Sequence, residues 1–327
     1  MSKQALIQAS ALNRYYGNYH AVNDFNLTLH KGEVLGLLGP NGAGKSTTMQ
    51  MLTGNISPSS GEVIINGVDL LDDPKRAKQS IGYLPEQPPL YRDMTSIEFL
   101  KYCAALHDIA KPSQKAAIDT AIERCGLGDV SSKLIANLSK GYQQRVGIAQ
   151  AILHQPDMVI LDEPTVGLDP IQITEIRELI RQLGKDHSVI LSTHILPEVQ
   201  AVCDRVQIIK QGRTVFSDTF EQLEKRQSAP ILIVGFDSAI DEGELLKLAG
   251  VKDIKALGDQ RFQLSYQKIP VASDVFQLSV DKGWKLNELK SQSESLEQIF
   301  MNLIHNENTH NKTKDVEVAE TMVAEHE

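Results

Sequence analysis

Residues 34–46 read VLGLLGPNGAGKS, a short apolar run followed directly by a glycine-rich loop. The apolar run at 34–38 is typical of a strand buried on both faces of a sheet. The residues from Lys45 to Leu52 have helical character. The loop between them matches the pattern G-x-x-x-x-G-K-[ST], which requires a strand before it and a helix after it. This order of elements predicts an α/β fold with a phosphate-binding loop.

The residue types of this loop suit a phosphate. Its glycines let backbone N–H groups turn toward the anion without obstruction by a Cβ, and the following helix adds its positive end. Lys45 is expected to bridge β- and γ-phosphates, and the Ser46 hydroxyl to ligate Mg²⁺. A plain glycine-rich turn is the alternative, but this pattern in the correct context is rare by chance. The expected nucleotide contacts are Gly39, Pro40, Asn41, Gly42, Ala43, Gly44, Lys45, Ser46 and Thr47.

Residues 158–163 read MVILDE, an apolar strand that ends in two carboxylates. In enzymes with this phosphate loop, an Asp at such a place helps to hold Mg²⁺, so Asp162 is predicted to be a metal ligand. Glu163 is then placed to orient or deprotonate the attacking water as a general base. A solvated strand end is the alternative interpretation. The phosphate loop in the same chain favours the catalytic one.

Residues 138–145 read LSKGYQQR and resemble the signature motif of the ATP-binding subunits of ABC transporters, typically L-S-G-G-Q followed by Q-R. Ser139 is expected to cap a helix whose N–H groups point at an anion. The resemblance implies that this anion is the γ-phosphate of an ATP held by a second subunit in a head-to-tail pair. Ser139 and Gly141 would contact it. Lys140 and Tyr142 depart from the family's pattern. The resemblance therefore defines the individual contacts between the two subunits less closely.

Three further segments follow in the family's order. Residues 167–169, Gly-Leu-Asp, resemble the D-loop through which the two subunits sense each other, which assigns Asp169 to the shared nucleotide site. Residues 192–194, Ser-Thr-His, resemble the switch segment, which implies that His194 contacts the γ-phosphate and the catalytic water. Tyr16 resembles the aromatic residue that stacks on adenine. A lone histidine after a strand is more often structural, but its place in this series favours the catalytic role.

One motif leaves an alternative open. The family's Q-loop usually reads hydrophobic-Gly-Tyr-x-Pro-Gln, whereas residues 81–87 read IGYLPEQ. Glu86 stands at the position of the usual glutamine, and Gln87 comes one step later. Glu86 offers an oxygen ligand to Mg²⁺. Either Glu86 or Gln87 is therefore the expected metal ligand of this segment.

Composition excludes several classes of function. The chain has 327 residues and a formal net charge of −9, which argues against a surface that grips nucleic-acid phosphates. Cys103, Cys125 and Cys203 are odd in number and far apart, so we expect neither a disulfide framework nor a zinc site. Residues 1–13 lack the apolar region of a signal peptide, and no stretch is long and apolar enough to span a membrane. Any membrane attachment is expected to depend on a partner.

The predicted architecture has three parts. Residues 1–217 form an α/β P-loop NTPase domain, a RecA-like core with an antiparallel β portion at the N-terminus and a helical insert at about 88–150 that carries the signature. The apolar runs at 158–161 and 189–191 flank an amphipathic helix at 171–183, which is a β-α-β unit. Residues 218–305 form a small α+β domain whose order, β-α-β-β-α-β, is that of a ferredoxin-like unit. Residues 306–327 are polar and acidic and are predicted to be disordered.

The resemblance implies an ATPase that uses Mg²⁺ and closes as a dimer, expected to be a homodimer, to drive a transmembrane permease from the cytoplasmic face of the cell membrane. The segments Tyr-Leu-Pro-Glu, L-S-K-G-Y and Ser-Thr-His-Ile are most similar to subunits paired with ABC-2-type exporter permeases, above all the gliding-motility-associated family.

Two rival interpretations have less support from the sequence. The first is a soluble ABC ATPase acting on ribosomes or DNA. Translation-type members usually carry two cassettes, and DNA-repair members insert long coiled coils, whereas this chain has one compact cassette. The second is a signalling GTPase, but the sequence lacks a guanine-reading motif. The transported substrate, the direction of transport and the choice between homodimer and heterodimer stay open.

Overall fold

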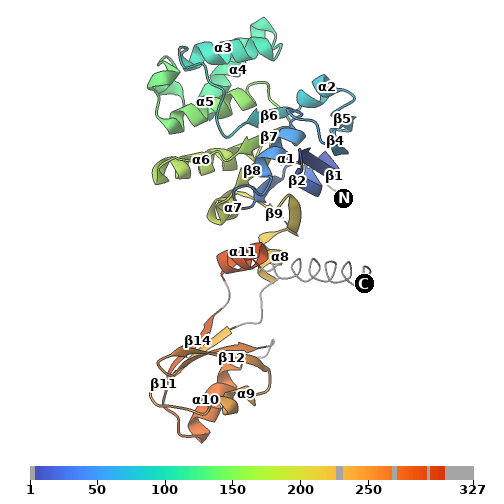
Figure 1. The fold of residues 1–327 in the computed structure, drawn as a ribbon. Coiled ribbons are helices and arrows are strands. Elements are labelled where there is room, and N and C mark those ends of the chain that lie inside the picture. The colour runs from blue at the N-terminus through green and yellow to red at the C-terminus, as the bar shows by residue number, and fades with distance from the viewer. Residues whose placement is uncertain (1–3, 226–230, 267–270, 293–294, 306–327) are drawn as a thin grey trace, which may run out of the picture. The chain divides into compact units, whose positions relative to one another are not determined.

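The computed structural model describes residues 4–225, 231–266, 271–292 and 295–305. The chain divides into two compact units, residues 1–220 and residues 221–327 (Figure 1). The division falls close to the boundary suggested by the sequence. The predicted tail at 306–327 lies outside the described residues. Within the described ranges, no helix combines the length and the apolar character needed to cross a bilayer.

A six-stranded sheet organises the first unit, in the order β10-β9-β3-β8-β7-β6. All pairs are parallel except that between the edge strand β10 and β9. Every residue of β3 and of β7 is buried, as expected for strands covered on both faces. The strands are β3 (Val34–Leu38), β6 (Ile81–Leu84), β7 (Met158–Asp162), β8 (Ser188–Thr193), β9 (Arg205–Lys210) and β10 (Arg213–Asp218). The carboxyl ends of β3, β7 and β8 therefore meet at one edge.

Alternate residues of β7 enter two different cores. Met158 and Ile160 join the core shared with the antiparallel sheet, and Val159 and Leu161 join the core shared with the helical insert. The antiparallel sheet has the order β2-β1-β4-β5, as the sequence predicts for the N-terminal portion. Its strands are β1 (Ala5–Tyr16), β2 (Tyr19–His30), β4 (Ser60–Ile65) and β5 (Val68–Asp69). The core shared with the antiparallel sheet also contains Met49, Met51 and Leu52 of α1 (Lys45–Leu52), so this helix packs with both sheets.

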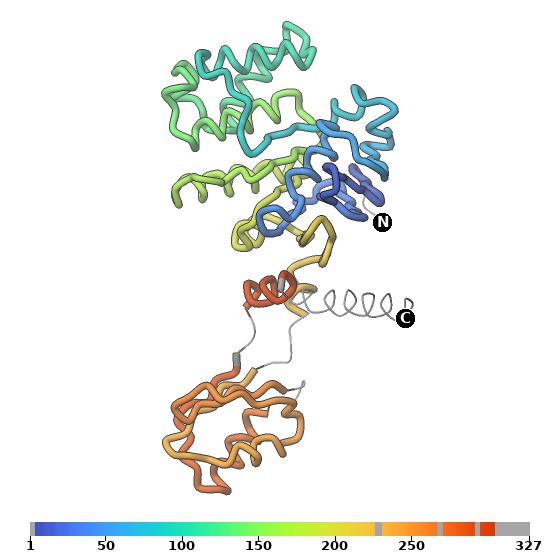
Figure 2. The backbone as a smooth tube through the Cα atoms, viewed as in Figure 1, coloured from blue at the N-terminus to red at the C-terminus, as the bar shows by residue number. Residues whose placement is uncertain are grey.

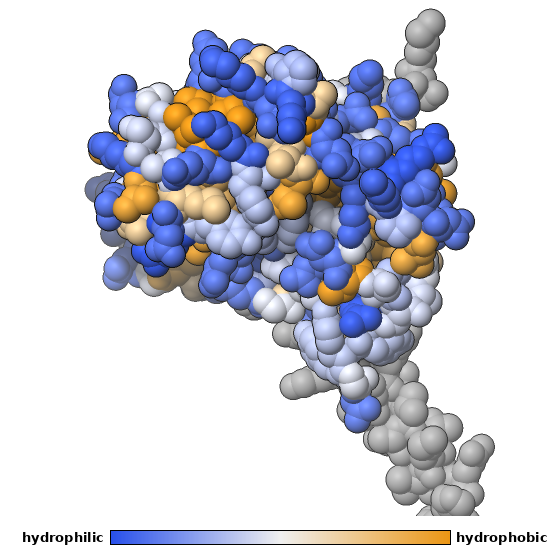
Figure 3. All heavy atoms as spheres, turned by 90° about the horizontal axis from the view of Figure 1, so that it is seen from above, coloured by the Kyte–Doolittle hydropathy of each residue, from blue (hydrophilic) through white to orange (hydrophobic). Residues whose placement is uncertain are grey.

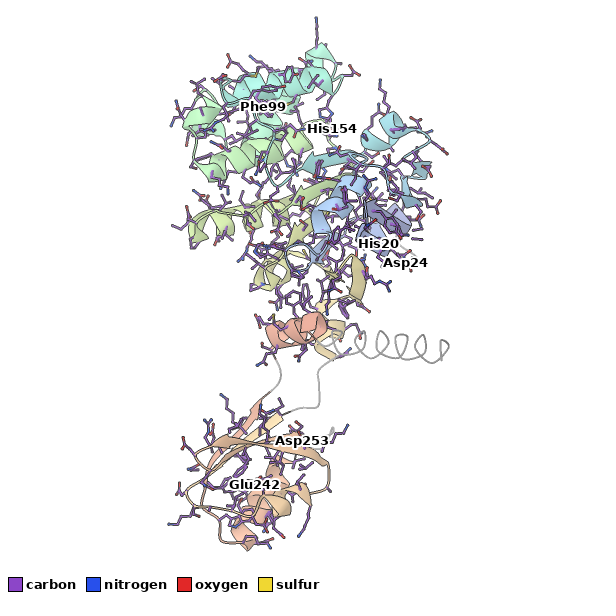
Figure 4. All side chains as sticks on the ribbon, in the orientation of Figure 1. His20, Asp24, Phe99, His154, Glu242 and Asp253 are labelled. Atoms are coloured by element: carbon purple, nitrogen blue, oxygen red, sulfur yellow. The ribbon has the colours of Figure 1, made fainter. Side chains whose placement is uncertain are left out.

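The first part of the helical insert contains two helices, α3 (Ser96–Leu106) and α4 (Lys111–Arg124). Asp108 has a left-handed backbone with φ 55°, and a proline stands in the first turn of α4, so one helix ends and another begins. The start of α3 is fixed by a capping box between Thr95 and Glu98. Phe99 anchors α3 in the core of the insert (Figure 4).

The remaining helices of the first unit are α2 (Pro74–Lys78), α5 (Lys140–Ile152), α6 (Pro170–Leu183) and α7 (Leu196–Val202), with two 3₁₀ turns at Gly128–Val130 and Ile135–Asn137. Helices α3, α4 and α5 gather at one end of this unit (Figure 1). The N-terminus of α5 carries the signature segment, so the helical insert presents that segment on a part of the unit separate from the phosphate loop.

The second unit contains a four-stranded sheet in the order β12-β13-β11-β14, with every neighbouring pair antiparallel. This order, with one helix in each crossover, is the split β-α-β arrangement of a ferredoxin-like unit, as predicted. Leu232, Phe236, Leu245 and Val275 share its core (the unit is traced in Figure 2). The elements are α8 (Phe220–Lys225), at the division between the units, β11 (Ile231–Phe236), α9 (Glu242–Leu246), β12 (Val251–Gly258), β13 (Arg261–Tyr266), α10 (Ala272–Asp281), β14 (Leu286–Gln292) and α11 (Leu296–His305).

Gly36 gives a direct test of the packing beneath β3. A Cβ at this position would lie 1.9 Å from Val199 Cγ1 on α7 and 3.1 Å from Cys203 Sγ. We expect Gly36→Ala to lower the free energy of unfolding by about 1–3 kcal/mol, because the core must shift to accept the methyl group. Gly128→Ala is the matched control, since nothing lies within 4 Å of its Cβ position. Urea unfolding of both variants checks this, and equal stability would contradict the close packing of α7 on β3.

Candidate functional site

A cavity of about 440 Å³ lies at the edge of the sheet where β3, β7 and β8 end. It brings together residues that are far apart in the sequence, from the antiparallel sheet, the phosphate loop and the ends of three parallel strands. Its lining residues are Tyr16, Tyr19, Ala21, Asn41, Gly42, Gly44, Lys45, Ser46, Thr47, Glu86, Glu163, Val166 and His194. Most of the residues that the sequence assigns to nucleotide binding and catalysis therefore face one space.

The mouth of the cavity is aromatic. Tyr16 and Tyr19 lie at the facing ends of β1 and β2, with 45% and 59% of their surface exposed. The Arg14 guanidinium lies over the Tyr16 ring, 4.8 Å from its centroid, so a planar base would stack on the opposite face of Tyr16. The sequence singled out Tyr16 but not Tyr19, whose hydroxyl lies 3.5 Å from the Gly42 carbonyl oxygen. The cluster of three tyrosines at 15, 16 and 19 is the sequence signal that points to both.

The phosphate loop has the backbone that its glycines allow. Gly44 has φ 101° and caps the N-terminus of α1, with no side-chain hydrogen bond to the first N–H groups of that helix. A Cβ on Gly44 would lie 2.6 Å from the Ala21 carbonyl oxygen, so only glycine fits this close approach. The start of α1 therefore offers N–H groups and its positive end toward the cavity.

Lys45 is buried, and its ammonium group has three oxygen partners. Nζ lies 2.9 Å from the Gly39 carbonyl oxygen, 3.3 Å from the Pro40 carbonyl oxygen and 3.1 Å from Oε1 of Glu163. The side chains of Lys45 and Glu163 are only 6% and 7% exposed. The predicted phosphate-binding lysine and the predicted general base thus form a buried ion pair.

Glu163 is held from two sides and on a strained backbone. Its φ is 48°, a left-handed conformation that is uncommon for a residue with a side chain and is enriched at functional sites. His194 Nδ1 lies 3.2 Å and 3.0 Å from its two carboxylate oxygens. The backbone N–H of Glu163 donates to Ser192 Oγ at 3.1 Å. These contacts fix the carboxylate at the cavity wall, next to the histidine that the sequence also assigns to catalysis.

Asp162 lies deeper, with 2% of its surface exposed. The hydroxyl of Ser192 donates to it, and Ser46 also hydrogen-bonds to its carboxylate. Burial raises the pKa of Asp162, the Ser192 and Ser46 hydroxyls lower it in part, and the nearby carboxylates of Glu163 and Glu86 raise it further. The pKa of Asp162 is raised overall. A bound cation would counteract this, because it stabilises the ionised carboxylate.

Glu86 lines the cavity, whereas Gln87 is not among the lining residues. Glu86 also lies close enough to Asp162 to raise the pKa of that carboxyl by charge repulsion. The placement therefore favours Glu86 of the two alternatives that the sequence left open.

Gly39, Pro40 and Ala43 of the phosphate loop are absent from the lining of the cavity, and three other predicted residues, from α5 and α6, form a separate group. Ser139 caps α5, with its Oγ accepting from the Tyr142 N–H at 3.4 Å. Asp169 caps α6, and its Oδ1 accepts from the N–H groups of Ile171 and Gln172 at 3.0 and 2.9 Å. Gly141 packs on the same helix start, because a Cβ there would lie 2.7 Å from Gln172 Cδ. We call Ser139, Gly141 and Asp169 the signature patch.

A buried glutamate, Glu198, stabilises the site, and the sequence patterns do not identify it. Glu198, 1% exposed, accepts from the hydroxyls of Thr165 and Thr193, each at 2.7 Å. It ties the segment after β7 to the end of β8, which positions Glu163 and His194 relative to each other. A single glutamate on a short helix carries no motif, so only the three-dimensional contacts identify it.

Comparison with known proteins agrees with this geometry. The family described as ABC transporter (ABC_tran) matches residues 22–166. The uncharacterized ABC transporter ATP-binding protein YxlF of Bacillus subtilis (strain 168) is 32% identical over 300 residues, which are 92% of this chain and 100% of the relative. The bacitracin transport ATP-binding protein BcrA of Bacillus licheniformis is 34% identical over 312 residues, 91% of this chain and 97% of that protein.

A solved structure, that of an ATP-binding subunit of an ABC transporter, superposes with a TM-score of 0.62 at 32% identity, covering 68% of this chain and 92% of the other. The P-loop NTPase fold, the gathered site and the similarity over nearly whole chains lead to one conclusion. This chain belongs to the ATP-binding subunits of ABC transporters, and it is an ATPase.

Proposed function

We propose that two copies of this chain close head to tail on two ATP molecules and thereby drive an ABC-2-type membrane permease in export. The observation that supports this most is the separation of the cavity from the signature patch within one chain. A helix start with an N-capping serine suits an anion, yet the phosphate loop of the same subunit lies elsewhere. A second subunit brings a signature patch to the open side of each cavity.

Within one cavity, the roles follow from the contacts. Tyr16 stacks on the adenine, and residues 39–47 hold the phosphates, with Lys45 on the γ-phosphate. Across the dimer, Ser139 and Gly141 contact the same γ-phosphate, and Asp169 lies beside them. Because only a triphosphate touches both subunits, ATP and ADP differ in affinity for the closed dimer, which a shift of population requires.

The residues present fit a magnesium ion. Ser46 and Asp162 are hydrogen-bonded to each other, and Glu86 lines the same cavity, so hard oxygen donors stand together beside a carboxyl whose pKa is raised. Within the described ranges, no group of three or more His, Cys, Asp or Glu residues could hold a metal ion. Mg²⁺ commonly takes only one or two protein carboxylates and completes its shell with phosphates and water. When bound, it neutralises charge on the phosphates during transfer.

Glu163 acts as the general base and His194 positions it. A carboxylate at the cavity wall can accept a proton from a water that attacks the γ-phosphate. The bond from His194 Nδ1 holds that carboxylate in place, and the rest of the imidazole, which is 38% exposed at the side-chain level, faces the γ-phosphate and the water. Both residues come from strand ends, so the rigid sheet sets their geometry.

Several features support an exporter permease as the partner. The segments at 83–86, 138–142 and 192–195 resemble those of subunits paired with ABC-2-type permeases and of the gliding-motility-associated family. One relative is named for bacitracin transport and another for linearmycin resistance. On the helical insert, Tyr91, Tyr102 and Leu106 are 51%, 39% and 65% exposed, which offers apolar surface to a membrane partner. Figure 3 shows hydrophobic patches among hydrophilic side chains in the view from above.

We further propose that residues 1–217 are the ATP-binding domain and residues 218–305 an accessory domain. The first range contains every residue assigned to the cavity and to the signature patch. The second has its own sheet and core.

Fractionation tests the two-component arrangement. The chain expressed without a permease is expected to stay in the supernatant after high-speed centrifugation, and to sediment with membranes at the cytoplasmic face when its permease is co-expressed. The permease should then co-purify from detergent. Membrane binding by the isolated chain that resists high salt would contradict the proposal, and co-sedimentation with ribosomes or DNA would favour the rival class.

A further inference from the structure

The ammonium group of Lys45 is fully engaged by protein oxygens. Lysine has three N–H donors, and three oxygens lie at 2.9, 3.3 and 3.1 Å: the carbonyls of Gly39 and Pro40 and the carboxylate of Glu163. A γ-phosphate that binds Lys45 must therefore replace at least one of them. The three oxygens differ in how freely they can move away from Lys45. This difference decides which of them a phosphate displaces.

The carbonyls of Gly39 and Pro40 belong to the phosphate loop itself. Gly39 is fixed by its own surroundings, since a Cβ there would lie 2.4 Å from the Ile209 carbonyl oxygen. Glu163 is a side chain from the end of a different strand, and its carboxylate has a second partner in His194 at 3.0 Å. It can release Lys45 and still keep a hydrogen bond. The carboxylate is thus the group that a phosphate displaces.

We propose that Glu163 competes with the γ-phosphate for Lys45, so that the Lys45–Glu163 ion pair lowers the affinity of the cavity for a triphosphate relative to a diphosphate and frees the general base only when a γ-phosphate has replaced the carboxylate. This inference rests on the proposed function, in which Lys45 binds the γ-phosphate. It assigns to Glu163 a role in nucleotide discrimination in addition to its proposed role as base.

The chemistry of the exchange supports this role. Both Glu163 and a phosphate oxygen are anions, and a buried ammonium group with two loop carbonyls cannot satisfy both in full. A diphosphate reaches Lys45 only with its β-phosphate, which the N–H groups of the loop and the start of α1 also hold, so it displaces the carboxylate less than a triphosphate does. The triphosphate extends toward the end of β7 and meets the pair. After the exchange, Glu163 keeps its contact with His194 Nδ1 and can accept a proton from water.

Nucleotide binding measured in single subunits isolates this effect from dimer closure and from hydrolysis. All variants carry Ser139→Arg, which blocks the signature patch, and titrations of ATP and of ADP are performed by calorimetry in EDTA. Glu163→Gln is expected to raise the affinity for ATP about 10-fold, in the range typical of coupling between two sites, and the affinity for ADP less than about twofold. Thermal unfolding of each variant verifies its folding.

Two further variants separate the ion pair from general charge repulsion. Glu163→Asp keeps the charge but is one methylene shorter, so it should lose Lys45 and also gain affinity for ATP. Glu178→Gln removes a carboxylate that lies outside the cavity and pairs with Arg181, and should change the ATP affinity less than about twofold.

Three results would overturn the inference: equal gains for ATP and ADP in Glu163→Gln, an equal gain for ATP in Glu178→Gln, or no gain in Glu163→Asp beside a gain in Glu163→Gln. Failure of the parent chain to bind ATP at all would instead contradict the proposed function. If Glu163→Gln does not fold, the comparison of Glu163→Asp with Glu178→Gln decides the question alone.

Discussion

Replacing Glu163 with glutamine is expected to lower the rate of ATP hydrolysis about 10²- to 10⁴-fold, the usual contribution of a positioned general base, while ATP remains bound. Glutamine preserves the shape of the side chain and can still bond to His194, but it cannot take a proton from water. Phosphate release at saturating ATP and Mg²⁺, with the permease present, measures the effect. Saturating ATP is needed because the same change is expected to alter nucleotide affinity.

Glu178→Gln is a suitable control for this experiment. Glu178 is a half-exposed residue of α6 that pairs with Arg181 and lies outside the cavity. Its replacement should leave hydrolysis within about twofold of the parent rate, since surface substitutions away from a site have small effects. A Glu163→Gln chain that hydrolyses ATP at nearly the parent rate would show that another group is the base.

The second large effect concerns assembly. With hydrolysis blocked by Glu163→Gln, ATP is expected to convert monomers into dimers, whereas ADP is not, because only the triphosphate reaches the signature patch of the other subunit. Light scattering after size-exclusion chromatography measures the mass. Adding Ser139→Arg should abolish this dimer and leave ATP bound, since it places bulk and charge where a phosphate must sit.

The matched control is Ser132→Arg, which introduces the same side chain at an exposed position of the helical insert outside the signature patch. It should leave the ATP-dependent dimer intact. Loss of the dimer in both variants would indicate a general effect of the added arginine. Persistence of the dimer in Ser139→Arg would remove Ser139 from the interface.

The sequence predicts those parts of the site that are contiguous in the chain. The loop at 39–46 has a fixed pattern because a phosphate, a strand and a helix start constrain eight adjacent positions. The β-α-β-β-α-β order of the second unit also follows from its apolar runs, and the structure confirms it. The exact place of the break between α3 and α4 comes from the structure, because Asp108 and the proline in the first turn of α4 act on the backbone and hardly interrupt the apolar pattern.

The sequence patterns do not predict contacts between residues from different segments of the chain. The ion pair of Lys45 with Glu163 joins two elements and depends on how β3 and β7 are placed in the sheet. The bracing by Glu198 depends on two threonine hydroxyls from separate segments. The choice between Glu86 and Gln87 is set by which side chain faces the cavity. Each of these requires the three-dimensional arrangement, because each depends on how elements that are distant in the sequence are placed around the cavity.

The central claim, that a phosphate loop and a signature patch from two subunits form one site, is tested most directly by mixing two inactive chains. Lys45→Ala removes the phosphate-binding lysine and is expected to weaken nucleotide binding itself, and Ser139→Arg blocks the signature patch. In the Glu163→Gln background, neither chain alone should dimerise with ATP. A mixed pair contains one intact site, with the loop from one chain and the patch from the other. We therefore expect ATP-dependent dimers in the mixture only. If the mixture stays monomeric at protein concentrations where Glu163→Gln chains dimerise, the head-to-tail arrangement is contradicted.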